Sequence, residues 1–298
     1  TSKTGCAPRI CGSSTARAFD GGASGIMKLR AELTDDDGKT TVIDTKWKPG
    51  PRNFSGLNNS PRKEVAAFQL QKLFLPPERW VAPPTVMRCV DPVKGTVPKR
   101  SGGKEFGCVW GVLSYWIDNI EPPETIDQQR FQEDMAYRTA IADLNLFTYL
   151  IGHRDTHRNN WYLSTDEDHV RGASVDNGVA FSGVKNFFVA IDWGDIHGPQ
   201  LSEDTVEMLR AITDEDLKEM NVLGAWRVED EQLTRVEVPA GTNHEGVTFE
   251  DGLLVHGLSE HEIHEVRERI DELLAKIDKG EIGTFEPADA SVVVDATR

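Results

Sequence analysis

The sequence of 298 residues lacks long apolar runs and an excess of positive charge. No apolar segment reaches the roughly 18 residues that a membrane-spanning helix needs, so we expect no membrane insertion. The formal net charge of -16, from 49 acidic against 33 basic residues, repels nucleic-acid backbones and anionic lipid headgroups. We therefore expect no nucleic acid as a partner, and any phosphate-bearing ligand needs a local basic or metal-filled pocket.

Cysteine is also scarce, and its spacing does not fit a zinc ribbon. The four cysteines, Cys6, Cys11, Cys89 and Cys108, include no CxxC pair. Cys6 with Cys11, and Cys89 with Cys108, would each form a local disulfide, and four free thiols are the alternative. The even count favours an oxidising compartment, secreted or extracytoplasmic, over a cytoplasmic location. Residues 1–3 carry no apolar signal core, so we expect that a secreted chain has lost its signal.

The first part of the chain predicts a sheet with one helix. Residues 1–18, in which Cys, Pro, Gly and Ser are crowded, are expected to be an irregular lead-in. A glycine-rich turn and two alternating segments around DDDGK then predict a β-hairpin that ends at Lys48. The stretch PRKEVAAFQLQKLF predicts a helix from Pro61, and two further strands are predicted in TVMRCV and CVWGVLSYWI. Residues 19–118 thus form a predicted sheet-rich lobe.

Beyond the proline pair Pro122 and Pro123 the pattern becomes helical. RFQEDMAYRTAIADLNLFTYLIG predicts one long apolar helix, and WYLS and GASVDNGVAF predict two short strands around an acidic turn. Three amphipathic helices follow, in LSEDTVEMLRAI, TDEDLKEMN and SEHEIHEVRERIDELLAKID. Residues 119–283 are therefore expected to be a mainly helical lobe, and residues 284–298 a flexible tail.

The polar residues of LIGHRDTHRNNW have the spacing of a catalytic loop. Asp155 is followed five residues later by Asn160, as in H-R-D-x-x-x-x-N, and a second acidic motif begins at Asp176. Phosphoryl transfer requires a carboxylate that orients the acceptor hydroxyl, and an amide and a second carboxylate that hold divalent metal ions. The spacing therefore predicts Asp155 as the catalytic residue, and Asn160 and Asp176 as ligands of Mg2+ or Mn2+.

The residues upstream stand in an order that suits ATP binding. Lys48 ends a predicted strand and Glu64 opens the next helix, so the lysine can reach phosphate while paired with the glutamate. Lys28 lies before them, and it follows Gly21, Gly22 and Gly25, which we expect to form a turn that covers the phosphates. Together these residues predict a nucleotide-binding site.

Three stretches resemble known kinase families. EVAAFQLQKLFLPPERWVAPPTVMR resembles the helix-and-strand signature of the secretory-pathway kinases that include the Golgi casein kinase and the glycosaminoglycan xylosylkinase. LFTYLIGHRDTHRNNW is similar to their catalytic loop and to that of type II phosphatidylinositol 4-kinases, and SVDNGVAF resembles the metal-binding motif of the latter. The resemblance covers about residues 19–182. It implies an α+β, two-lobed, atypical protein-kinase-like fold, with ATP between a sheet-rich N-lobe and a mainly helical C-lobe.

The resemblance also implies roles for single residues. Lys28 and Lys48 would contact the ATP phosphates, and Glu64 would pair with a lysine or a metal ion. Asp155 would be the catalytic aspartate and Asp176 the main metal ligand. The Golgi members carry an acidic residue where this chain has Asn160, and the segment between the two lysines is longer here. These departures concern the acceptor more than the chemistry.

The sequence therefore predicts an ATP-dependent phosphotransferase with a hydroxyl acceptor, either a protein Ser/Thr or a glycan. An inositol lipid is a poorer acceptor because no basic or apolar membrane-binding patch is evident. Two alternatives stay open: a pseudokinase-type nucleotide-binding interaction module, and a zinc-dependent hydrolase using His153 and His157. The zinc alternative lacks the glutamate of H-E-x-x-H, because Arg154 takes its place, and it has no obvious third ligand.

Simpler structural roles are the alternatives for single residues. Lys48 and Glu64 would then form only a surface pair, and Asp176 would begin a hairpin turn, since Asx-Gly favours positive φ. Trp110 and Trp116 flank the expected hinge between the lobes, where core packing is favoured over contact with adenine.

Overall fold

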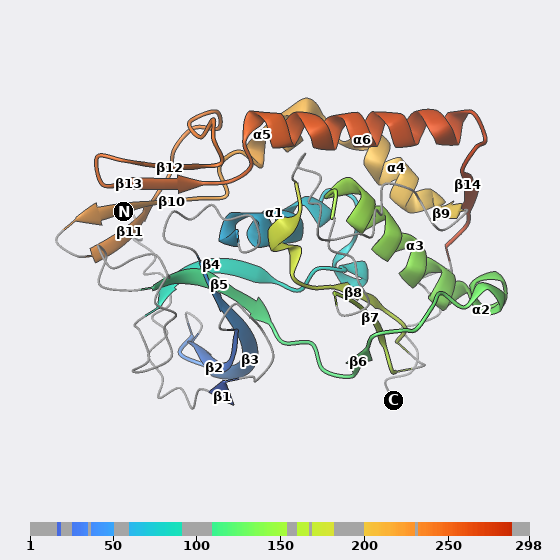
Figure 1. Cartoon of the computed structure of the whole chain (residues 1–298), viewed down its shortest axis with the longest axis horizontal. Coiled ribbons are helices and arrows are strands. Elements are labelled where there is room, and N and C mark those ends of the chain that lie inside the picture. The colour runs from blue at the N-terminus through green and yellow to red at the C-terminus, as the bar shows by residue number, and fades with distance from the viewer. Residues whose placement is uncertain are drawn as a thin grey trace. The chain divides into compact units, whose positions relative to one another are not determined.

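The chain has the α+β class that the sequence predicts, with helices and mostly antiparallel sheets in the computed structural model (Figure 1). The structure describes residues 17–18, 26–34, 37–50, 60–90, 109–153, 160–166, 169–181, 200–229 and 232–287. Two compact units are present. The first comprises Thr1–Phe68, Pro83–Asp118 and Lys218–His261, and the second comprises Gln69–Ala82, Asn119–Leu217 and Glu262–Arg298. Among the described residues, no helix combines the length and apolar character needed to cross a membrane.

The first unit is built on a five-stranded antiparallel sheet in the order β1-β2-β3-β5-β4. Its strands are β1 (Arg17–Ala18), β2 (Met27–Thr34), β3 (Thr40–Pro49), β4 (Thr85–Val90) and β5 (Val109–Tyr115). The predicted hairpin is confirmed, because β2 pairs with β3 and Met27 lies opposite Trp47. Gly38 makes its turn possible with a φ of 79°, a conformation that glycine adopts without steric cost. The predicted strands β4 and β5 are confirmed as well.

Strand alternation gives this sheet two apolar faces, since successive side chains point to opposite sides. One face carries a buried cluster of Met27, Leu29, Trp47, Val109 and Leu113. The residues come from β2, β3 and β5, so the cluster spans the centre of the sheet. The alternating segments of the sequence therefore have apolar residues where the sheet needs them.

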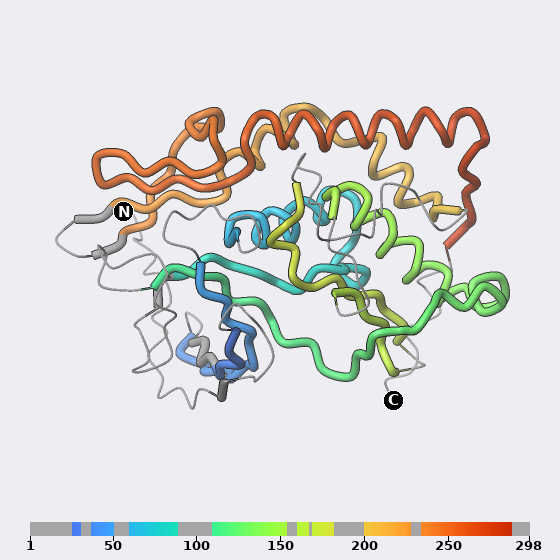
Figure 2. The backbone as a smooth tube through the Cα atoms, viewed as in Figure 1, coloured from blue at the N-terminus to red at the C-terminus, as the bar shows by residue number. Residues whose placement is uncertain are grey.

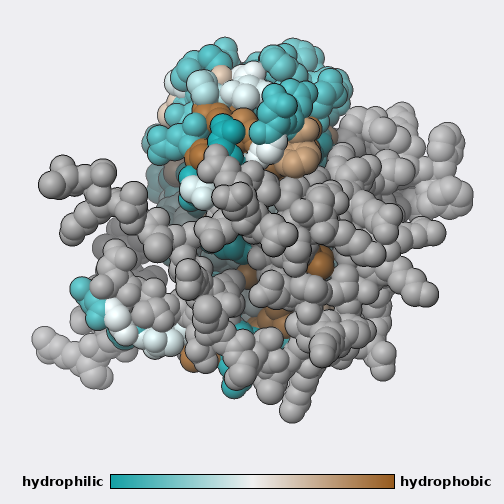
Figure 3. Space-filling model, turned by 90° about the vertical axis from the view of Figure 1, so that its left-hand side faces the viewer, coloured by the Kyte–Doolittle hydropathy of each residue, from teal (hydrophilic) through white to brown (hydrophobic). Residues whose placement is uncertain are grey.

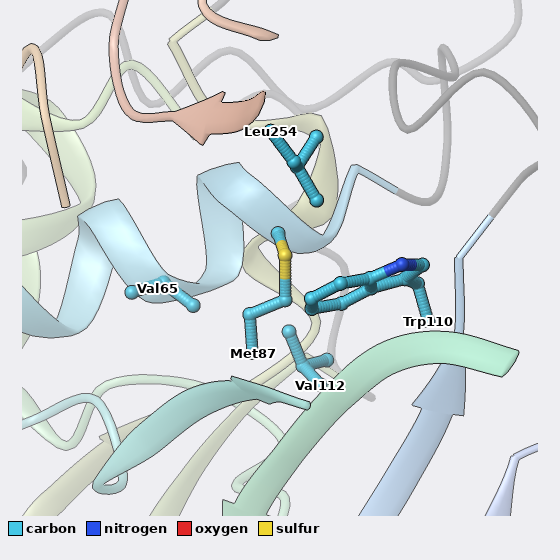
Figure 4. Close-up of a cluster of buried hydrophobic side chains, with 5 residues drawn as sticks. All are labelled: Val65, Met87, Trp110, Val112 and Leu254. Atoms are coloured by element: carbon cyan, nitrogen blue, oxygen red, sulfur yellow. The ribbon is translucent and has the colours of Figure 1, made fainter. Parts of the chain in front are cut away.

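The opposite face is covered by α1 (Pro61–Gln71), the predicted helix that begins at Pro61. Proline suits this first position because its fixed φ is helical and its missing N–H is not needed there. Figure 4 shows the buried cluster on this face, whose side chains come from α1, β4, β5 and a later strand: Val65, Met87, Trp110, Val112 and Leu254. Trp110 is 1% exposed, so its predicted role in core packing is confirmed.

A second antiparallel sheet belongs to the same unit and has the order β11-β10-β13-β12. Its strands are β10 (Gly224–Glu229), β11 (Gln232–Val236), β12 (Val247–Glu250) and β13 (Leu253–His256). No strand was predicted in these segments, which lie within residues 119–283, the part of the chain expected to be mainly helical. These strands are short and rich in charged residues, so pairing and packing against the first sheet define them more than local pattern does. In Figure 3 the described surface at the top, where β12 and β13 lie, is mostly hydrophilic with hydrophobic atoms between.

An aromatic stack joins the two sheets of the first unit. Trp226 of β10 meets Trp110 edge-on, with ring centroids 5.3 Å apart, and stacks on His256 at 5.0 Å. His256 is 1% exposed, and within the described part of the chain neither of its ring nitrogens has a hydrogen-bond partner. Burial lowers the pKa of His256 to about 3, and the positive charges of Arg62 and Arg235 act in the same direction.

The second unit combines helices with two small sheets. Its helices are α2 (Gln128–Glu133), α3 (Met135–Leu150), α4 (Glu203–Ala211), α5 (Asp214–Glu219) and α6 (Glu260–Asp278). A few residues of α5 and α6 belong to the first unit. Two short 3-10 turns are η1 (Pro77–Arg79) and η3 (Asn177–Val179). One antiparallel sheet contains β6 (Ile120–Glu121), β7 (Trp161–Ser164) and β8 (Gly172–Ser174), and β9 (Gln200–Ser202) pairs in parallel with β14 (Gly283–Phe285). The three predicted amphipathic helices are confirmed as α4, α5 and α6. β14 includes residues 284 and 285 of the expected tail.

The predicted long apolar helix is broken into α2 and α3, whose different directions Figure 2 shows. Asp134 causes the break: its backbone is extended, with φ -108° and ψ 108°, and its carboxylate accepts a hydrogen bond from the Tyr137 amide at 3.0 Å. Aspartate at this position satisfies an amide that the first turn of α3 would otherwise leave unpaired. Because every residue of α3 from Ala140 to Leu150 is buried, this helix forms the core of the second unit.

Candidate functional site

Lys48 and Glu64 form a buried ion pair in the first unit. The Lys48 Nζ lies 3.1 Å from Glu64 Oε1, and the two side chains are 2% and 4% exposed. Lys48 lies opposite Val112 in the sheet register, so it points to the face that α1 covers, and Glu64 lies in the first turn of α1. The alternative of a surface pair is therefore wrong.

Lys28 lies on the same sheet face as Lys48. It is paired with Lys46 in the sheet register, and Lys46 and Lys48, two residues apart in β3, point to the same side. The Lys28 Nζ is 2.9 Å from Asp44 Oδ2 and 4.4 Å from the centre of the Trp116 ring. The hydrogen bond from Lys28 is the main cause that holds the pKa of Asp44 below its usual value. Lys28 thus has a carboxylate and an aromatic partner, and its contact with ATP phosphate stays a prediction.

The second unit brings Asn160 and Asp176 to the same end of a two-stranded ladder. Trp161 of β7 pairs with Ser174 of β8, so Asn160 directly precedes one strand of the pair and Asp176 closely follows the other. The Val175 amide donates a hydrogen bond to the Asn160 carbonyl at 2.8 Å. The strand pairing therefore brings the backbones of the two predicted metal ligands close together in space, although the residues lie apart in the sequence.

Asp176 has a left-handed backbone, with φ 60° and ψ 47°. Aspartate adopts this conformation more readily than most residues, but surrounding structure must still maintain it. The residues after Asp176 form η3 instead of a second strand, so both the hairpin-turn alternative and the strand predicted across GASVDNGVAF beyond residue 174 are wrong. Asn177 is 2% exposed, and its Oδ1 accepts a hydrogen bond from the Ser174 hydroxyl at 2.9 Å.

Several predicted site residues lie outside the described part of the chain. These are Asp155, His157, Gly21, Gly22 and Gly25. His153 is described: it is 1% exposed, and its amide donates to the Thr148 carbonyl at 2.9 Å. Within the described ranges, no group of three or more His, Cys, Asp or Glu side chains is arranged to hold a metal ion. Because His157 lies outside these ranges, this finding does not test the zinc alternative, which stays a prediction.

A second polar cluster in the second unit was not predicted. The Arg79 guanidinium binds Asp143 through two hydrogen bonds of 2.7 and 2.6 Å and binds Asp204 at 2.5 Å. Burial raises the pKa of Asp143 to about 6, although Arg79 acts in the opposite direction. A cavity of about 590 Å3 is lined by this cluster and by residues that include Ala140 and Gly172. The one signal in the sequence was an aspartate inside the apolar stretch AIADLNLF.

No family model matches the chain, and no curated protein matches it either. Among solved structures, the chain is similar to one described as "The structure of hydra Fam20 with sugar", with a TM-score of 0.49 and 15% sequence identity. The match covers 91% of this chain and 88% of that chain. At this score and identity the likeness assigns neither a fold family nor an activity.

Proposed function

We propose that the chain is an ATP-dependent phosphotransferase with a two-lobed atypical-kinase fold, which moves the γ-phosphate to a hydroxyl group of a protein Ser/Thr or a glycan. The buried Lys48–Glu64 pair is the observation that carries the proposal. Kinases hold ATP phosphates with a strand lysine paired to a glutamate of the next helix, and this chain has that order and that contact.

The energetics of the pair also support a functional role. Burial of two charges costs several kcal/mol per ion, and an apolar pair of similar volume is often as stable or more stable. A pair of this kind, between the sheet and a helix whose contact is otherwise apolar at residues such as Val65 and Met87, is therefore difficult to explain by stability alone. The two charges are explained if Lys48 neutralises phosphate charge and Glu64 orients the Lys48 side chain.

The remaining predicted residues complete the chemistry. Asp176 and Asn160 would hold Mg2+ or Mn2+, since carboxylate and amide oxygens are the hard ligands that these ions prefer. The bound ion would neutralise charge on the β- and γ-phosphates. Asp155 would orient and deprotonate the acceptor hydroxyl. Lys28 and the turn at Gly21, Gly22 and Gly25 would contact the phosphates.

The test is transfer from labelled ATP, with Mg2+ or Mn2+, to a panel of Ser/Thr proteins, proteoglycan sugars and inositol lipids. We expect label on a protein or a glycan, with loss of transfer in Asp155→Asn. The control variant is Lys39→Ala, which removes an exposed lysine just before β3 and should transfer normally. ATP binding without transfer would favour a nucleotide-binding interaction module, and absence of both would reject the proposal.

A further inference from the structure

Gln71, the last residue of α1, is fully buried and anchors the loop that follows. Its Oε1 accepts hydrogen bonds from the backbone amides of Val81 and Ala82, each at 2.8 Å. Its Nε2 donates to the Ala82 carbonyl, also at 2.8 Å. The Gln71 side-chain amide therefore both donates to and accepts from the backbone of the loop, as a neighbouring strand would. These bonds hold residues 81 and 82 against the end of α1.

The same backbone segment holds β8. The Val81 carbonyl accepts a hydrogen bond from the amide of Ser174, the last residue of β8, at 3.1 Å. The Ser174 hydroxyl then donates to Asn177 Oδ1 at 2.9 Å. Gln71, Ser174 and Asn177 are each at most 2% exposed, so water does not compete for these bonds. A continuous hydrogen-bonded path thus leads from the end of α1 to both sides of Asp176.

Asp176 needs such support. A left-handed backbone at a non-glycine residue costs free energy and persists only where its surroundings hold it. Ser174 and Asn177 bracket Asp176 and are bonded to each other through their side chains. The adjacent Val175 amide is bonded to Asn160. A shift of the Ser174–Asn177 pair would therefore move Asp176 and change its position relative to Asn160.

We infer that Gln71 is a positioning residue, which acts through residues 81–82 and the Ser174–Asn177 pair to hold Asp176 and Asn160 in the geometry that binds metal. The metal-binding part of this inference rests on the proposed function. Glu64, the partner of Lys48, lies in the first turn of the same helix that Gln71 ends.

Two variants interrupt the path at different points. Ser174→Ala removes only the hydroxyl that binds Asn177, and Gln71→Met removes three hydrogen bonds at similar side-chain volume. Ser202→Ala is the matched control, because Ser202 is also a buried serine of the second unit and its hydroxyl binds Asp204 instead. If Gln71→Met does not fold, Gln71→Glu takes its place, because glutamate keeps an oxygen that accepts from the Val81 and Ala82 amides and loses the donor to the Ala82 carbonyl.

Two measurements are made on the full chain: hydrogen-deuterium exchange of residues 172–181, and titration with Mn2+ in the presence of a non-hydrolysable ATP analogue. We expect faster exchange in this segment and Mn2+ affinity weaker by about tenfold or more in Ser174→Ala and Gln71→Met, the usual effect of losing a group that orients a metal ligand. Ser202→Ala should match the wild type in both. Ser174→Thr keeps the hydroxyl that binds Asn177, so its Mn2+ affinity should be closer to that of the wild type than the affinity of Ser174→Ala is.

The two measurements separate the inference from the function on which it rests. Unchanged exchange of residues 172–181 in both Ser174→Ala and Gln71→Met would overturn the inference, whatever the protein binds. Faster exchange with unchanged Mn2+ affinity would overturn the metal-positioning role. A wild-type protein that binds neither Mn2+ nor the nucleotide would reject the proposed function and the metal-positioning role together, while the exchange data would still decide whether Gln71 holds the turn.

Discussion

The Val175 amide donates a hydrogen bond to the Asn160 carbonyl at 2.8 Å, so the residue before Asp176 is held by the backbone of Asn160. Backbone hydrogen bonds next to a strand pair fix positions more tightly than side-chain contacts between mobile loops do. The β7–β8 pair therefore positions the backbone of the two predicted metal ligands, and the Ser174–Asn177 side-chain bond adds support on the Asp176 side.

The two aspartates should respond differently to substitution. Asp176→Ala should lose the rise in melting temperature that ATP with Mg2+ or Mn2+ gives the wild type, because metal and nucleotide no longer bind. Asp155→Asn should keep most of that rise but lose transfer by about two orders of magnitude or more, the scale of a general base. Differential scanning fluorimetry and the transfer assay measure the two effects. Asp166→Asn, an exposed aspartate after β7, is the control, and full transfer by Asp155→Asn would contradict its assigned role.

The buried ion pair predicts a difference between single and double variants. Lys48→Met leaves Glu64 buried without its cation, so the free energy of unfolding should fall by about 3–5 kcal/mol. Lys48→Met combined with Glu64→Gln should recover most of this loss, yet should still lack transfer because no cation reaches the phosphates. Urea unfolding and the transfer assay provide the measurements. A double variant with wild-type transfer would rule out the role of Lys48.

His256 should make the protein less stable in acid. The unfolded chain binds a proton at a histidine near pH 6.5, whereas the folded chain binds one at His256 only near pH 3. As the pH falls from 6.5 toward 3, the unfolded state binds more protons, so this group lowers the free energy of unfolding by about 1.4 kcal/mol per pH unit.

The test is urea unfolding at several pH values between 7 and 4. His256→Leu should show a smaller loss of stability toward low pH than the wild type, although it loses the stack on Trp226 at every pH. His264→Ala, which changes an exposed histidine of α6, should keep the wild-type pH dependence. An unchanged pH dependence in His256→Leu would show that His256 does not cause the acid sensitivity.

The cysteines should form two local disulfides if the protein matures in an oxidising compartment. Cys89 belongs to β4, and Cys108 directly precedes β5, its antiparallel neighbour, so their bond would close the connection between these strands. Cys6, Cys11 and Cys108 lie outside the described residues, and both bonds stay predictions from spacing. Non-reduced peptide mapping is the measurement. Four alkylatable thiols after thiol trapping would contradict both bonds and favour a cytoplasmic location.

The parts of the fold that sequence predicted are those with a local pattern. The β2–β3 hairpin, α1 and α4 each show their periodicity within a short window, and the order of Lys48 and Glu64 was enough to predict their pairing. The break at Asp134 was missed because the sequence alone does not distinguish an aspartate inside a helix from an aspartate that caps the start of a new helix.

Features made by distant residues were not predictable in this way. The β10–β13 sheet depends on pairing such as Gly224 with His256, and its short strands have no strong alternation of their own. The bonds of Gln71 to residues 81–82 and of Arg79 to Asp143 and Asp204 join segments that the sequence does not mark as neighbours. Without the tertiary structure, each of these polar side chains is indistinguishable from a solvated one.

With 2% of its side chain exposed, Lys48 can meet an ATP phosphate only after neighbouring atoms move apart. Nucleotide association would then proceed in two steps, and in stopped-flow experiments its observed rate constant would level off at high ATP concentration, at a ceiling set by the opening motion. Other anions that do not stabilise the open conformation would then bind Lys48 both more slowly and more weakly than ATP does. If Lys48 binds phosphate as proposed, slow nucleotide entry would follow from the burial of its ammonium group.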